Sequence, residues 1–154
     1  MNNNKIFPLK VGLFGIGLEA YWEQFEGLEK RLQNYISIAE EKMKSYQCEV
    51  VNLGLIDNPE KAIIAGHDFR KADVDIIFLY VTTYALSSTV LSVVQRAKVP
   101  VIILNLSPEA AIDYAAFNTM TDRYFSSCAS CCSLHRHHTL RPACCLFLLP
   151  MAYQ

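Results

Sequence analysis

Short, continuously apolar runs recur along the first two thirds of the chain and are separated by longer amphipathic stretches. Runs of this kind are typical of strands that are buried on both faces of a parallel sheet. The third run is the longest and is rich in β-branched and aromatic residues, so we place it at the centre of the sheet. The pattern predicts four strands, at residues 10–15, 48–56, 74–83 and 100–106.

The stretches between these runs have the spacing and the boundary residues of helices. From Phe25 to Tyr46, apolar residues recur along one face while acidic and basic residues take the other, which predicts an amphipathic helix. The segment 57–60 offers an N-cap residue followed by proline, and so predicts the start of a second helix that ends near Ala72. We expect a third helix from Ser87 or Ser88, acting as the cap, to Lys98, and over residues 108–117 either a short fourth helix or an arm that follows the last strand.

Alternating strands and helices predict an α/β fold with one parallel sheet and helices on both of its faces. We expect the flavodoxin-like (Rossmann-like) strand order 2-1-3-4. Ligands of such sheets bind beyond the carboxyl ends of the strands, near the point where the strand order reverses. This directs attention to three loops, at residues 15–27, 81–88 and 105–108.

The loop after the first strand carries two candidate patterns. Gly15, Gly17 and Ala20 fit the permissive dinucleotide-binding pattern G-x-G-x-x-A. However, helical spacing starts only near Phe25, which leaves a loop too long for the tight turn that cradles a pyrophosphate, and glycines also serve strand packing. The same loop holds aromatic, carboxylate and amide groups that suit a small polar ligand such as a sugar, namely Glu19, Tyr21, Trp22, Glu23 and Gln24. The alternative is that Trp22 and Phe25 cap the sheet.

A second polar cluster, Thr82-Thr83-Tyr84, follows the third strand. Its hydroxyls are expected at the same edge of the sheet, where they face a ligand or bond to nearby backbone groups. His67 has no metal-ligating neighbour at suitable spacing and is expected at the surface of the second helix. Residues 1–123 contain no nucleophile motif, no phosphate-binding loop and no paired metal-binding histidines on a helix.

The composition of the chain changes after Arg123. Residues 124–154 contain no Asp, Glu, Lys, Gly, Val, Ile or Asn, yet hold five of the six cysteines. We therefore divide the chain into an α/β domain at 1–123 and a cysteine-rich tail at 124–154, which we expect to be weakly ordered or translated out of its ancestral frame. The alternative is a structural zinc site, because tetrahedral zinc favours cysteine thiolates and histidine imidazoles as ligands. The candidate ligands in the tail are Cys128, Cys131, Cys132, His135, His137, His138, Cys144 and Cys145.

Overall charge and hydropathy exclude several classes of partner. A net charge of −1 gives no basic footprint for nucleic acid. The apolar run at residues 143–150 is far shorter than the roughly 20 residues that cross a bilayer. Because the start of the chain also lacks the pattern of a signal peptide, we expect a cytoplasmic protein with reduced thiols and no membrane partner.

Two stretches resemble the N-terminal domain of the L-arabinose isomerase and L-fucose isomerase superfamily. They read KVGLFGIGLEAYWEQFEGLEKRL at residues 10–32 and IIFLYVTTYALSSTVLSVVQRAKVPVIILNLSP at residues 76–108. The similarity extends from about Lys10 to Arg123 and is greatest to the arabinose-isomerase-like branch. It implies an aldose–ketose isomerase, a metal-dependent intramolecular oxidoreductase of carbohydrate metabolism that is oligomeric and uses a divalent metal such as manganese.

The resemblance also implies what this chain lacks. The metal-binding Glu and His residues of the family lie in later domains, and no position here matches them, so we expect a truncated protein that holds no metal and is inactive alone. The role that carries over is to pack subunits into a homo-oligomer and lend loops to a sugar site. The matching loop positions are Leu18, Glu19, Tyr21, Trp22, Thr82, Thr83 and Tyr84. The alternatives are a stand-alone flavodoxin-like module that binds a sugar or phosphate, and a zinc-dependent interaction module that uses the tail.

Overall fold

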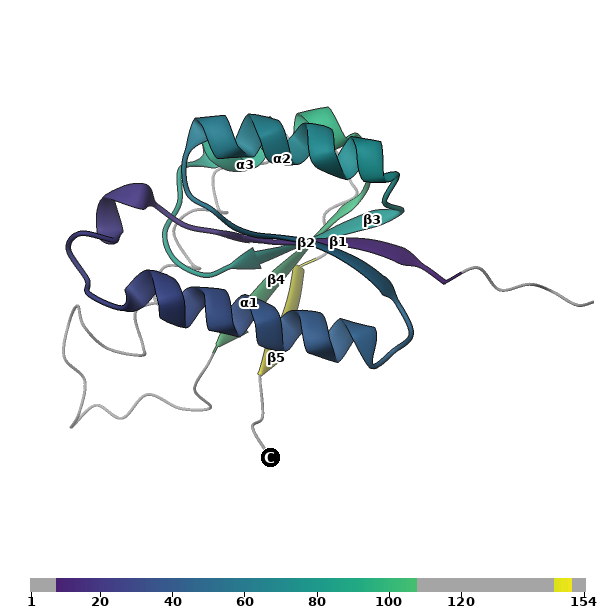
Figure 1. Cartoon of the computed structure of the whole chain (residues 1–154), viewed down its shortest axis with the longest axis horizontal. Coiled ribbons are helices and arrows are strands. Elements are labelled where there is room, and N and C mark those ends of the chain that lie inside the picture. Colours follow the sequence, from purple (N-terminus) through teal and green to yellow (C-terminus); the bar gives the residue numbers. More distant parts are fainter. Residues whose placement is uncertain (1–7, 108–145, 151–154) are drawn as a thin grey trace, which may run out of the picture.

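A parallel sheet runs through the part of the protein that the computed structural model describes, residues 8–107 and 146–150 (Figure 1). Its strands lie in the order β2-β1-β3-β4-β5. The first four therefore have the predicted order 2-1-3-4, and every strand pair is parallel. The strand bounds are Lys10–Ile16 (β1), Glu49–Ile56 (β2), Ile76–Val81 (β3), Val101–Ser107 (β4) and Leu146–Pro150 (β5).

Helices cover both faces of the sheet, as predicted. Helix α1 (Leu28–Lys44) lies on one face, and α2 (Pro59–Ala72) and α3 (Ser87–Ala97) lie side by side on the other (Figure 1). A single 3-10 turn, η1 (Glu19–Tyr21), interrupts the long connection from β1 to α1. The protein thus has the α/β flavodoxin-like arrangement expected from its sequence.

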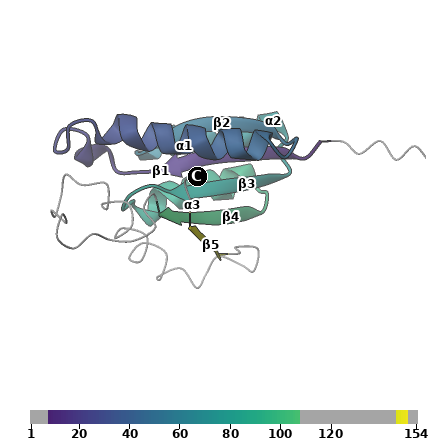
Figure 2. The same cartoon turned by 90° about the horizontal axis from the view of Figure 1, so that it is seen from below.

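The fifth strand was not predicted. It pairs in parallel with the outer edge of β4, from Ile103 opposite Leu146 to Ser107 opposite Pro150 (Figure 2). This strand comes from the segment interpreted as a tail. The predicted helix at 108–117, the predicted domain end at Arg123 and all the tail cysteines and histidines lie outside the described residues, so the domain boundary and the zinc alternative stay predictions.

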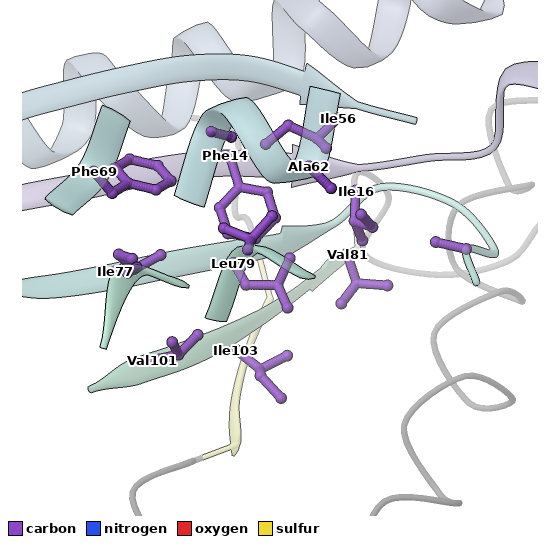
Figure 3. Close-up of a cluster of buried hydrophobic side chains, with 14 of the residues drawn as sticks. Phe14, Ile16, Ile56, Ala62, Phe69, Ile77, Leu79, Val81, Val101 and Ile103 are labelled. Carbon is purple, nitrogen blue, oxygen red and sulfur yellow. The ribbon is translucent and has the colours of Figure 1, made fainter. Parts of the chain in front are cut away.

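Two buried clusters hold the helices to the sheet, because alternate residues of each strand point to opposite faces. Under α2 and α3, Phe69 packs against Phe14 with ring centroids 5.9 Å apart, next to Leu79 (Figure 3). On the opposite face a smaller cluster lies against α1, formed by Leu13, Ile36, Ala39, Tyr80, Leu104 and Leu106. Burying such side chains stabilises the fold by about 1.5–3 kcal/mol each.

The start of α2 agrees with the sequence prediction, whereas the starts of α1 and α3 differ from it. Asn58 caps α2, since its side chain accepts a hydrogen bond from the backbone N–H of Lys61 at 2.9 Å and Pro59 follows it. The predicted serine cap of α3 is wrong, because Leu86 occupies the N-cap position without any side-chain bond. Helix α1 begins at Leu28 rather than Phe25, after Gly27 in the left-handed region. These differences move helix ends but not the fold.

A β-bulge interrupts strand β2. The pairing shifts between Leu13 opposite Asn52 and Gly15 opposite Leu55, so β2 contains one extra residue. Gly54 lies in the bulge and has a φ of 69°, a value that residues other than glycine rarely adopt. Its backbone N–H donates a hydrogen bond to the side-chain oxygen of Asn52 at 2.8 Å. On the α1 face, the Asn52 amide in turn donates to Glu40 at 2.6 Å.

Candidate functional site

The carboxyl ends of β1, β2 and β3 meet at one edge of the sheet, where the predicted ligand-facing residues lie. We call residues 17–27, which follow β1, the β1 loop, and residues 82–86, which follow β3, the β3 loop. Both loops begin directly beyond buried strand ends, at Ile16 and Val81. The two predicted clusters therefore lie at the ends of neighbouring strands.

A carboxylate at the end of β2 holds the β1 loop in place. Asp57 is 4% exposed, and its Oδ2 accepts a hydrogen bond from the indole N–H of Trp22 at 2.7 Å. Lys61, one turn along α2, contacts both oxygens of the same carboxylate, at 2.8 Å and 3.0 Å. The backbone N–H of Glu19 donates to the Asp57 carbonyl at 3.3 Å. Both side-chain hydrogen bonds to this carboxylate, from the β1 loop and from α2, fall on Oδ2, while Oδ1 accepts no hydrogen bond within the described residues and has only its ion-pair contact with Lys61.

The Trp22 ring also occupies the space beside the second glycine of the G-x-G pattern. A Cβ atom built on Gly17 would lie 2.8 Å from the Trp22 ring, closer than real Cβ contacts allow. The glycine is needed for this close approach. Because Trp22 fills the position and α1 starts only at Leu28, the loop lacks the turn that binds a pyrophosphate in dinucleotide-binding folds.

The other residues of the β1 loop are more accessible. Leu18 precedes η1 and is half-buried, whereas Glu19 is exposed. Tyr21 is half-buried and lies edge-on to Phe25, with ring centroids 5.8 Å apart. Glu23 and Gln24 are also exposed. Of the predicted polar residues, Glu19 presents its side chain to solvent while Trp22 is engaged in packing and a hydrogen bond.

The two threonines of the β3 loop bond to backbone groups. Thr82 is fully buried, and its hydroxyl donates to the Ile16 carbonyl at the end of β1 at 2.7 Å. Thr83, also fully buried, donates to the Tyr84 carbonyl at 2.9 Å. Tyr84 itself is 37% exposed. The structure thus shows the backbone-bonding interpretation for both hydroxyls, while ligand contact by this loop stays a prediction.

The charges at this edge surround Lys61. Its hydrogen bond to Asp57 raises the pKa of the Lys61 ammonium, burial opposes the rise, and the negative charges of Asp57, Glu19 and Glu29 add to it. About half of the Lys61 side chain is exposed, so solvent screens part of these interactions. Lys61 is therefore a charged, partly accessible group beside the β1 loop.

The described residues provide no ligand set for the divalent metal that the resemblance implies. Within residues 8–107 and 146–150, no three His, Cys, Asp or Glu side chains lie close enough together to hold an ion. His67 is exposed on α2, as predicted. We therefore derive no step through a metal at this edge.

Sequence reasoning found Asp57 only as a candidate cap and missed its central position, and it did not consider Lys61. The signal for the ion pair was available, because an acid and a lysine four residues apart at a helix start are neighbours on one face. The contact from Trp22 to Asp57 spans 35 residues and left no local pattern.

Comparison with known proteins gives no relatives: no protein-family model matches the chain, and no curated protein matches it. The likeness to the arabinose and fucose isomerases therefore rests on the residues quoted above. Among the described helices, none has the length and apolar character needed to span a membrane.

Proposed function

We propose that this chain carries the N-terminal α/β domain of an aldose–ketose isomerase of the arabinose and fucose isomerase type. The quoted sequence stretches that support the proposal cover β1, β3 and β4, the loops that follow β1 and β3, the start of α1 and all of α3. The strand ends and loops among them build the carboxyl edge of the sheet. The resemblance therefore concerns the part of the fold where parallel α/β proteins bind ligands.

The observation that carries the proposal is that some side chains at this edge fix the loops while others stay accessible to a ligand. Trp22 and Thr82 are tied to the ends of neighbouring strands, and Thr83 bonds to the Tyr84 carbonyl within its own loop, so these residues fix the backbone of the loops. Glu19 and Tyr84 stay accessible on those fixed loops. A carboxylate and a phenol in such positions suit a sugar, since they accept or donate hydrogen bonds to hydroxyls and cover an apolar ring face.

In this proposal the chain orients a sugar and does not isomerise it. Proton transfer between adjacent sugar carbons needs a positioned acid and base and, in the family it resembles, a divalent metal. We assign the described residues to binding, with Glu19 and Tyr84 at the ligand and Leu18, Tyr21, Trp22, Thr82 and Thr83 supporting the loops.

The coding DNA beyond codon 123 gives the sharpest test. If the proposal holds, one of the other two reading frames continues with α/β periodicity and with acids and histidines suited to a metal. Two frames without such a continuation would contradict it. The purified chain should also fail to isomerise L-arabinose or L-fucose with or without manganese, and robust turnover would overturn its assignment as a binding domain alone.

A stand-alone small-ligand module is the second candidate. The observation that favours it is that both carboxyl-edge loops are held by hydrogen bonds within the chain, which preforms their backbone. Thermal unfolding with pentoses, hexoses and inorganic phosphate tests it, because a ligand of the native state raises the midpoint with concentration. We expect a saturable rise that Tyr84→Ala abolishes and that Tyr46→Ala, a change of an exposed tyrosine beyond α1, leaves intact. No midpoint shift with any of them would contradict this candidate.

A further inference from the structure

Glu40 of α1 and Asn52 of β2 form a polar pair beside the apolar cluster that lies against α1. The Asn52 amide donates to Glu40 Oε2 at 2.6 Å, and the Lys44 ammonium lies 2.6 Å from Glu40 Oε1. Hydrogen bonds from Lys44 and Asn52 lower the pKa of the Glu40 carboxyl, while burial opposes this change. Glu40 is therefore a carboxylate at neutral pH and can only accept hydrogen bonds.

The carboxylate of Glu40 determines how the Asn52 side chain is oriented. An asparagine amide has an oxygen that accepts and a nitrogen that donates, and rotation of the group exchanges the two. Because Glu40 only accepts, the nitrogen of Asn52 turns to Glu40, and its oxygen turns to the backbone N–H of Gly54, which donates to it at 2.8 Å. Gly54 lies in the bulge of β2. The pair therefore supplies the acceptor that the bulge uses.

The place of the bulge along β2 determines the pairing at the carboxyl end of this strand. Beyond the bulge, Ile56 lies opposite Ile16. The β1 loop bonds to this end of β2, because the Gly17 N–H donates to the Ile56 carbonyl at 3.0 Å and the Trp22 indole donates to Asp57 at 2.7 Å. A shift of the pairing by one residue moves a strand by about 3.3 Å along its neighbour. Such a shift would break both hydrogen bonds to the loop.

We propose that Glu40 and Asn52 are positioning residues for the β1 loop: their hydrogen bond holds the bulge at Gly54, and the bulge places Asp57 where it binds Trp22. Asn52 and Asp57 are roughly 16 Å apart along an extended strand, so the effect passes through the backbone of β2. The element with two states is the register of β2, with its bulge in place or displaced. Loop geometry depends on this pair with or without a ligand, whereas an effect on sugar binding rests on the proposed function.

The indole N–H of Trp22 gives a direct readout, because the chain has a single tryptophan and its indole gives one resonance in the proton–nitrogen spectrum of the full chain. Asn52→Leu removes the acceptor of the bulge and the donor to Glu40. We expect the indole resonance of the folded variant to shift and its exchange with solvent to become several times faster. An indole unchanged in Asn52→Leu would overturn the proposal and leave the pair only the role of fastening α1 to the sheet.

Lys44→Met is the matched control. It removes the other partner of Glu40 and leaves the bonds from Asn52 to Glu40 and from Gly54 to Asn52 in place. We expect this variant to keep the wild-type indole resonance and exchange rate, whatever it loses in stability. Equal changes of the indole in Lys44→Met and Asn52→Leu would show a general loosening of the protein and contradict a positioning role.

An exchange of the two side chains tests the part played by Glu40. In Asn52→Asp a second carboxylate faces Glu40 and is repelled by it, so the indole N–H of Trp22 should exchange faster. Addition of Glu40→Gln reverses the pair, because the glutamine amide donates to the aspartate, which still accepts from the Gly54 N–H. Slow indole exchange restored in the double variant supports the proposal, and a double variant as fast as Asn52→Asp contradicts it. Should Asn52→Leu fail to fold, these two variants decide the question.

Thermal unfolding of the same variants with pentoses and hexoses separates this proposal from that of a sugar site. An altered indole in Asn52→Leu, with no sugar-dependent shift of the midpoint even in the wild type, supports the positioning pair and contradicts the sugar site. A saturable midpoint shift in the wild type, together with an unchanged indole in Asn52→Leu, supports the sugar site and contradicts the positioning pair.

Discussion

The β1 loop and the β3 loop reach the same edge of the sheet but are fixed there by different chemistry. The β1 loop is held by a buried carboxylate that binds an indole N–H and an ammonium group. The β3 loop is held by neutral hydroxyls that bond to backbone carbonyls. Charged hydrogen bonds are roughly twice as strong as neutral ones, so the first loop depends on one group far more than the second does.

This difference predicts which substitutions at the edge destabilise the protein most. Removal of Asp57 frees partners from two elements at once, the loop and α2, whereas removal of one threonine hydroxyl frees a single carbonyl. The anchor of the β1 loop also includes Lys61, whose ammonium pKa is raised by its hydrogen bond to Asp57, so this part of the anchor responds to alkaline pH. The following changes test the contrast in order of expected effect.

The largest effect is expected from Asp57→Ala. Loss of the carboxylate leaves the Trp22 N–H and Lys61 without their partner and should lower the free energy of unfolding by about 2–3 kcal/mol, as for hydrogen bonds to charged groups. Urea unfolding followed by circular dichroism measures it. Asp57→Asn keeps an acceptor and should cost less, and a neutral Asp57→Ala would refute the anchoring role.

Trp22→Phe should have the next largest effect, about 1–2 kcal/mol, because Asp57 keeps Lys61 but loses its indole donor. The same unfolding experiment applies. Since Trp22 is the only tryptophan of the chain, its emission in the wild-type protein also reports the loop, and Asp57→Ala, which removes the acceptor, should shift that emission. An emission unaffected by Asp57→Ala would show that the ring is held by packing alone.

Thr82→Val should destabilise the protein by about 1 kcal/mol, since the Ile16 carbonyl loses its donor while the shape of the side chain is kept. The loss should be the same in acidic and alkaline buffer, because no ionisable group takes part in this bond. Unfolding midpoints compared at several pH values check this. A loss that varies with pH would remove the contrast between the loops.

The smallest effect is expected from alkaline pH. Because the folded-state pKa of Lys61 is raised above 10.5, its contribution is fully present below pH 10.5 and is lost as the pH rises through the raised value. Thermal unfolding of wild type and Lys61→Met should therefore converge at high pH. Partial exposure of Lys61 keeps the difference small. A constant gap between the two proteins would contradict the assignment.

The sequence predicted the order of the first four strands and the helices on both faces, because continuous apolar runs and helical spacing reflect which faces are buried. It placed the start of α1 at Phe25 and a serine cap on α3, since periodicity and cap preference cannot locate the backbone conformation at Gly27 or Leu86. The loop residues were found by composition. Their partners were not, because Trp22 meets Asp57, and Thr82 meets Ile16, only after the sheet has formed.

The bulge at Gly54 separates strand β2 into two halves of opposite side-chain parity. Before it, odd-numbered residues such as Leu53 face α2; after it, the even-numbered Ile56 does. A change that kept residue 54 but forced β2 into regular pairing would therefore turn every later residue over, carrying Ile56 out of the core and Asp57 away from Trp22, whereas removing the bulge residue itself would leave Leu55 and Ile56 on their present faces. A protein engineer should treat this single glycine as the element that sets the phase of the strand, and place insertions or tags elsewhere.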